Sequence, residues 1–187
     1  MLTKEQLIIE LTVDPTKGFI ERLAVILPDQ HYDLNELIGL TFHTNKQIGF
    51  HAAWLLDTMM LTHPERYIEH LEYFAKRMAD VTNESCKRHY ARIMMHLTMP
   101  DAPATIRQKL AAIDMEDVVE KCFDWLIDPK VKVAVKVFAA DTLFNLHRRY
   151  DWIKEELANQ MQFIMRTGGP AIQSRGKKLL AAMESKN

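Results

Sequence analysis

The residues with the clearest chemical potential are aromatic and cationic side chains spaced for one helix face. Phe50 and Trp54 stand four residues apart, and the pairs Arg88/Arg92 and Lys132/Lys136 repeat this spacing. Aromatic side chains dominate the binding energy of protein interfaces, and guanidinium and ammonium groups bind carboxylates and phosphates. We therefore predict a site for a partner protein or an acidic peptide, with six binding residues: Phe50, Trp54, Arg88, Arg92, Lys132 and Lys136.

Two alternatives stand beside this prediction. The aromatic pair could be covered by N-terminal helices. The cations could form a solvated face or an intramolecular ion pair, for which Asp57 and Asp141 are the candidate partners.

Histidine and cysteine residues do not form a metal-ligand pattern. Glu69 and His70 fill only the last two positions of an H-x-x-E-H motif. His51, His89 and Cys86 are too few and too scattered for a tetrahedral site. The sequence contains no G-x-S-x-G, no P-loop and no G-x-G-x-x-G. We expect no catalytic residue, no metal and no cofactor.

These residues belong to helices that share one apolar stripe. In four segments, apolar or small residues recur at offsets of about 0, 4, 8 and 11, which is one side of a helix. The segments start at Ile48, Cys86, Val135 and Ile172, and the starts are 38, 49 and 37 residues apart. Self-similarity at this period is typical of a helical solenoid, in which each unit buries its apolar face against the next.

The register also identifies the side chains that should point away from the core. Offsets 2, 6 and 9 lie opposite the stripe, and we expect them to form the floor of a concave groove. They are Phe50, Trp54, Asp57; Arg88, Arg92, Met95; Val137, Asp141, Phe144; and Ser174, Lys178, Ala181.

Composition agrees with one soluble helical domain. The chain has 187 residues, 48% of them hydrophobic, and only 6 glycines and 7 prolines, too few for the turns of an all-β fold. A net charge of −1 gives no general attraction to nucleic acid or anionic membrane. Residues 1–45 are acidic and residues 166–187 are basic, which leaves weak head-to-tail homodimerisation open. The polar start and the absence of a long apolar run predict a cytoplasmic protein without membrane spans.

Capping residues and prolines predict the element boundaries of a single domain over 1–187. Six caps are expected: Thr3, Asp33, Asn45, Asn83, Asp114 and Asp151. We expect a helix to stop before Pro28, another to run unbroken from Pro64 to Ala79, and a third to reach Tyr150. The expected units are N-terminal capping helices over 3–27, repeats over about 33–62, 64–97, 114–150 and 151–184, and an inserted helix over about 105–113.

The third repeat carries a family resemblance. Leu126-Ile127-Asp128-Pro129, a tight turn and then a Val-Lys-x-x-Ala-x-x-x-Leu-x-x-Leu pattern resemble a HEAT repeat. The resemblance implies an all-α, right-handed α-solenoid of about four stacked antiparallel helix pairs, usually a non-enzymatic scaffold. It also implies a hydrogen-bonded ladder between units, with Asp128 and Lys136 in the matching positions.

Two narrower resemblances remain open. Ala52-Ala53-Trp54 and His63-Pro64-Glu65 are similar to a group of short bacterial HEAT-like proteins. Trp54 and Asp57, beside the basic cluster Lys87, Arg88 and Arg92, also resemble the groove of HEAT-like DNA alkylpurine glycosylases. No second tryptophan can be assigned to that groove, and we therefore favour a protein-interaction scaffold over a nucleic-acid binder or a self-associating subunit.

Overall fold

The computed structural model describes residues 2–13 and 15–185, which form eleven α-helices, one 3-10 helix and no strand. The elements are α1 (Lys4–Thr12), α2 (Lys17–Asp29), α3 (Leu34–Leu40), α4 (Lys46–Thr62), η1 (Pro64–His70), α5 (Leu71–Met78), α6 (Glu84–Thr98), α7 (Ala104–Ala112), α8 (Glu116–Ile127), α9 (Val133–Leu146), α10 (Trp152–Met165) and α11 (Pro170–Glu184).

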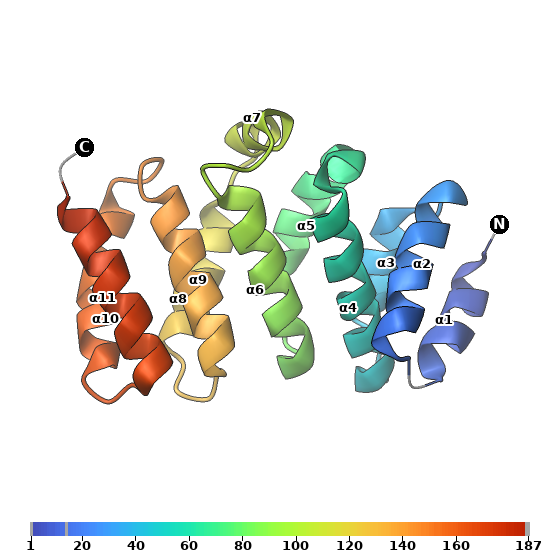
Figure 1. Ribbon diagram of the computed structural model, residues 1–187, viewed down its shortest axis with the longest axis horizontal. Helices are drawn as coiled ribbons and strands as arrows, with labels where there is room; N and C mark the ends of the chain where they lie inside the picture. Colours follow the sequence, from blue (N-terminus) through green and yellow to red (C-terminus); the bar gives the residue numbers. More distant parts are fainter. Residues whose placement is uncertain (1, 14, 186–187) are drawn as a thin grey trace.

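The helices stack in two layers along the long axis of the molecule (Figure 1). The inner layer contains α2, α4, α6, α9 and α11, and the outer layer contains α3, η1, α5, α8 and α10. Neighbouring helices pack more closely in the inner layer than in the outer layer. A stack curves toward its more closely packed side, so the inner layer lines the concave face. The predicted α-solenoid is confirmed.

The predicted apolar stripe forms the core. Of its sixteen residues, all except the half-buried Leu180 are buried. Small residues let neighbouring backbones approach, and Ala139 is fully buried in the middle of α9. Gly49 serves a similar contact, because a Cβ there would lie 2.8 Å from the Thr41 carbonyl oxygen. The repeat pattern thus encodes how closely each helix meets the next.

In one repeat, a large aromatic residue, Tyr90, stands where the other three have Ala or Gly. Its contacts form what we call the aromatic joint. Tyr90 of α6 is fully buried, and its ring stacks on Phe74 of α5 with centroids 4.9 Å apart. The Phe42 ring meets Tyr90 edge-on at 6.2 Å. The Tyr90 hydroxyl lies 2.7 Å from Thr41 Oγ1, which itself donates to the Ile38 carbonyl. This joint ties α3, α5 and α6 together through side chains.

Most predicted helix starts are confirmed by cap geometry. The side chains of Thr3, Asp33, Asn45 and Asn83 each accept a backbone N–H of the first helical turn. Asp114 Oδ1 accepts the Glu116 N–H at 3.0 Å, one residue before the N-cap position of α8.

Asp151 stands at the expected N-cap position of α10, but its side chain makes no cap hydrogen bond. Several expected boundaries were wrong. Pro28 lies inside the last turn of α2, and the helix ends only where His31 adopts φ 55°. The expected helix from Pro64 to Ala79 is divided into η1 and α5, because Tyr67 leaves helical geometry at φ −116°. The helix α9 ends at Leu146 instead of Tyr150.

The expected insertion is present as α7. It lies beyond the ends of the two layers and packs against η1, α5 and α6 (Figure 1). Arg149 fixes the end of α7 by donating from Nη1 to the Leu110 carbonyl oxygen at 2.8 Å. In the parts of the chain that are described, no helix is long and apolar enough to cross a membrane.

Candidate functional site

Helices α4, α6 and α9 of the inner layer enclose a groove of about 510 Å³, which we call the central groove. Five of the six predicted binding residues line it, and Lys136 does not. Its lining residues are Phe50, Trp54, Asp57, Glu84, Ser85, Arg88, His89, Arg92, Lys132, Ala134 and Val135. The predicted residues come from three separate repeats, so stacking of the units creates this site.

Aromatic rings form one wall of the central groove. Phe50 and Trp54 stack with centroids 6.2 Å apart, and His89 lies 5.7 Å from Phe50. The N-terminal helices pack beside these rings: His51, one residue after Phe50, places Nδ1 2.7 Å from the Leu11 carbonyl oxygen. Phe50 and Trp54 remain half-buried and line the groove, so the N-terminal helices do not seal it.

A buried carboxylate lies beneath the basic side of the groove. Asp57 is only 2% exposed, and its Oδ2 is 2.9 Å from His89 Nδ1 and 3.1 Å from Arg92 Nη1. Its Oδ1 is buried and has no hydrogen-bond partner among the described residues. The expectation that Asp57 faces outward was wrong, because Arg92 of the next repeat covers it. For Arg92, the intramolecular alternative is confirmed.

Arg88 and Lys132 are the cations that remain available to a partner. Both side chains are exposed, and neither forms an ion pair with another described residue. Lys87 is different, because it is buried and pairs with Glu84 within α6. The groove therefore presents two unpaired charges beside an aromatic wall.

The ladder between repeats uses other residues than the resemblance implied. Asp128 accepts the Lys130 N–H at 2.8 Å inside its own turn. Burial lowers the pKa of Lys136, and the negative charge of Asp128 opposes this shift. The interhelical bridge is instead made by Asp141 and Arg175, with Oδ1 and Nε 2.5 Å apart. Asp141 was expected to face outward, yet it is buried beneath Arg175.

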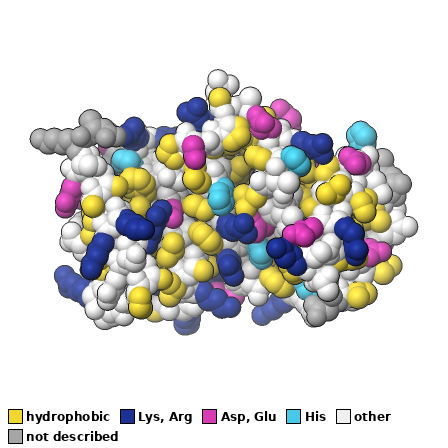
Figure 2. Space-filling model, viewed as in Figure 1, with side chains coloured by type: hydrophobic (Ala, Val, Ile, Leu, Met, Phe, Trp, Pro, Cys, Tyr) yellow, Lys and Arg dark blue, Asp and Glu magenta, His cyan; other side chains and the backbone are white. Residues whose placement is uncertain are grey.

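The two layers differ in charge. Inner-layer helices carry ten Lys or Arg and six Asp or Glu. Outer-layer helices carry five Lys or Arg and ten Asp or Glu. Two of the six inner acids are the buried, paired Asp57 and Asp141. Figure 2 shows the inner face, where Lys and Arg side chains lie among hydrophobic ones. The concave face is thus positive toward an approaching ligand.

Both cysteines are structural. Burial raises the pKa of Cys86 to about 12 and raises the pKa of Cys122 further. We expect neither thiol to react with Ellman's reagent at pH 8 in the folded protein, because the thiolate is the nucleophile. Unfolding in guanidinium chloride should release two reactive thiols per chain. Rapid reaction of one thiol under native conditions would contradict this assignment.

The described residues provide no cluster of metal ligands and no second tryptophan in the central groove. Within the described residues, no group of three His, Cys, Asp or Glu side chains could hold a metal ion. Trp125 is buried in the core, and Trp152 stacks on Phe123 of the outer layer, so neither joins Trp54 in the central groove.

The sequence assigned no binding role to His89, whose ring lies 5.7 Å from Phe50 and whose Nδ1 lies 2.9 Å from Asp57 Oδ2. A signal was available, because His89 follows Asp57 by 32 residues, as Arg92 follows it by 35 and Arg175 follows Asp141 by 34. Separations near the repeat period indicate contact between equivalent faces of adjacent units.

Comparison with known proteins supports the architecture. The family profile described as a HEAT repeat domain matches residues 8–183, from within α1 to the last turn of α11. No curated protein matches the chain. With its repeated apolar stripe, two-layer stack and nearly complete family match, the chain belongs to the HEAT repeat domain family.

Proposed function

We propose that this protein is a non-enzymatic interaction scaffold whose central groove binds an acidic segment of a partner protein. The observation that carries the proposal is the convergence of Phe50, Trp54, Arg88 and Lys132 from three repeats in one groove. HEAT repeat proteins commonly present such concave surfaces to partners.

The groove combines two kinds of recognition. The stacked Phe50 and Trp54 rings offer apolar surface that is already held in place, so little side-chain entropy is lost on binding. Arg88 and Lys132 offer charge-assisted hydrogen bonds to carboxylates. A segment with an apolar or aromatic residue next to acidic residues matches this pattern.

Charge supports an acidic partner over a basic one. The groove contains two carboxylates, but Asp57 is paired with Arg92 and Glu84 is paired with Lys87. Arg88 and Lys132 have no such neutralising partner in the described chain. A basic segment would face uncompensated repulsion, which disfavours that class of partner.

Affinity capture with matched variants tests the proposal. Purified wild type, Arg88→Glu/Lys132→Glu and the control Lys76→Glu would capture proteins from native cytosol, and mass spectrometry would identify them. Lys76 is exposed on the outer layer, so its reversal changes charge without touching the groove. We expect partners to be retained by wild type and Lys76→Glu and lost by the groove variant, because reversing both charges replaces charge-assisted contacts with repulsion.

Peptides tiled across a captured protein would then locate the bound segment, which should be acidic. Equal capture by the groove variant, with its fold verified by circular dichroism, would show that the concave face is not the binding surface. If Trp54→Ala lost the partner while Arg88→Glu/Lys132→Glu still bound it, only the aromatic wall would form the site. That result would contradict a role for charge.

A nucleic-acid-binding protein is the second candidate, because the structure does bring Trp54 and Asp57 into one basic groove. The burial of Asp57 beneath Arg92 argues against its acting on a base. Nuclease treatment of the capture experiment separates the two candidates. Partners that disappear with nuclease would favour nucleic acid, and salt-sensitive binding to DNA would follow.

A further inference from the structure

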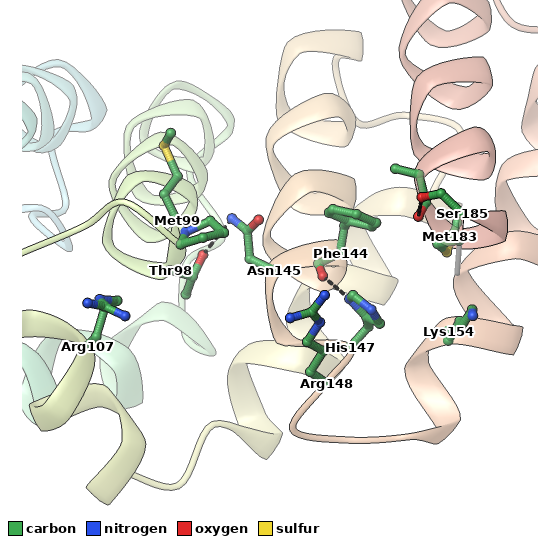
Figure 3. A pocket seen from close by; sticks show the side chains of 12 residues that line it. Thr98, Met99, Arg107, Phe144, Asn145, His147, Arg148, Lys154, Met183 and Ser185 are labelled. Carbon is green, nitrogen blue, oxygen red and sulfur yellow. Dashed lines mark hydrogen bonds between the residues drawn. The ribbon is translucent and has the colours of Figure 1, made fainter. Parts of the chain in front are cut away.

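A second hollow lies at one edge of the inner layer, apart from the central groove. It has a volume of about 960 Å³ and is bordered by the C-terminal ends of α6, α9 and α11, together with α7 and the start of α10 (Figure 3). We call it the edge pocket. Its volume lies within the range of about 300–1,000 Å³ that is usual for small-molecule sites.

Three cations surround the edge pocket. Figure 3 shows Arg107 on α7, Arg148 just after α9 and Lys154 on α10 around its rim. Among the described residues, no carboxylate lines the pocket, and none of the three cations forms an ion pair. Arg107 Nε donates to the Ala102 carbonyl oxygen at 3.1 Å, which orients its guanidinium and leaves both Nη groups free.

The helix ends do not account for this much positive charge. Each C-terminal helix end carries a partial charge of only about −0.5. Three carboxylates, Asp151, Glu155 and Glu184, line an adjoining pocket that Lys154 also borders, and none of them forms an ion pair with a described cation of the edge pocket. The cationic side chains at the rim therefore outnumber the described carboxylates that line the edge pocket itself, which favours an anionic ligand.

Apolar side chains also line the edge pocket. Phe144 stacks on His147 with ring centroids 5.0 Å apart, and Met99 and Met183 contribute further apolar surface. His147 Nδ1 is bonded to the Phe144 carbonyl oxygen, which fixes the imidazole in this stack. The polar side chains are already engaged: Asn145 donates to the Met95 carbonyl oxygen and to Thr98 Oγ1.

We infer that the edge pocket binds a small organic phosphate, with its phosphate at the cationic rim and its planar or apolar body against Phe144. A guanidinium binds phosphate oxygens in two parallel hydrogen bonds, which assigns the anion to Arg107 and Arg148. Lys154 adds a third charge from the other side of the rim. The site is independent of the central groove, so it does not rest on partner binding there.

Calorimetric titration with AMP, inorganic phosphate and adenosine tests both halves of the site. We expect AMP to bind at one site per chain and more tightly than phosphate or adenosine, with an affinity that falls as salt rises. Arg148→Ala should weaken AMP binding about tenfold or more, because it removes a charge-assisted contact. Phe144→Leu should weaken AMP but leave phosphate binding unchanged.

Lys178→Ala is the matched control, since this exposed inner-layer cation lies outside the pocket. It should bind AMP as wild type does. Circular dichroism would establish that each variant is folded. Absence of AMP and phosphate binding in wild type, or equal weakening by Lys178→Ala and Arg148→Ala, would overturn the inference. Adenosine binding as tightly as AMP would overturn the role of the cations.

Discussion

Replacing Tyr90 with alanine is expected to lower the free energy of unfolding by about 3–5 kcal/mol, the range for a fully buried aromatic residue. The ring lies between Phe74 of α5 and Phe42, and it is completely buried. Its removal leaves a cavity between α5 and α6. These two helices are joined by large side chains and not by a close approach of their backbones. Urea denaturation followed by circular dichroism would measure the loss.

Tyr90→Phe is the control that separates packing from hydrogen bonding. It keeps the ring and removes only the bond to Thr41 Oγ1, which retains its own acceptor on Ile38. We expect a cost of only about 1 kcal/mol. If phenylalanine were as damaging as alanine, the hydroxyl bond and not the aromatic joint would hold these repeats together.

Arg175→Ala should destabilise the protein by about 1.5–3 kcal/mol at neutral pH, because Asp141 would stay buried without its charged partner. Burial raises the pKa of Asp141, and Arg175 opposes that shift by hydrogen bonding and by its charge. Removing Arg175 therefore raises the folded-state pKa of Asp141 further. Chemical denaturation of both proteins over a range of pH would measure the effect.

The sign of the pH dependence follows from linkage. A carboxyl whose pKa is raised on folding binds more protons in the folded state, so stability falls as pH rises through the interval between its unfolded and folded pKa values. This interval is wider in the variant, so the difference from wild type should shrink as pH falls. Lys178→Ala should show no such trend, and Asp141→Asn/Arg175→Ala should recover stability at neutral pH. A loss independent of pH would contradict the ion-pair explanation.

The sequence predicted the architecture because repeated local patterns encode it. Val135, Ala139, Leu143 and Leu146 stand at helical spacing, and burying such a stripe requires another helix of the same kind. The caps Asp33, Asn45 and Asn83 were equally predictable, since each acts on the first turn of its own helix. The division of the segment after Pro64 into η1 and α5 was not predictable from the sequence. The break at Tyr67 lies in η1, which packs against α4 and α7, and such contacts have no local signature.

What the sequence determined by itself is the all-helical repeat and the buried sides of its helices, because both follow from periodicity within one segment. It also singled out five residues that line the central groove, although the stacking of the repeats brings them together. Tertiary structure alone decided which charges remain free. Asp57 and Asp141 lie opposite the apolar stripe in the helical register, yet both are buried because Arg92 and Arg175 from the next repeats cover them. The edge pocket also has no local signature, since its cations come from three segments that meet only when the stack forms. Contacts between distant segments depend on the angle and distance between helices, and spacing along the chain does not specify either.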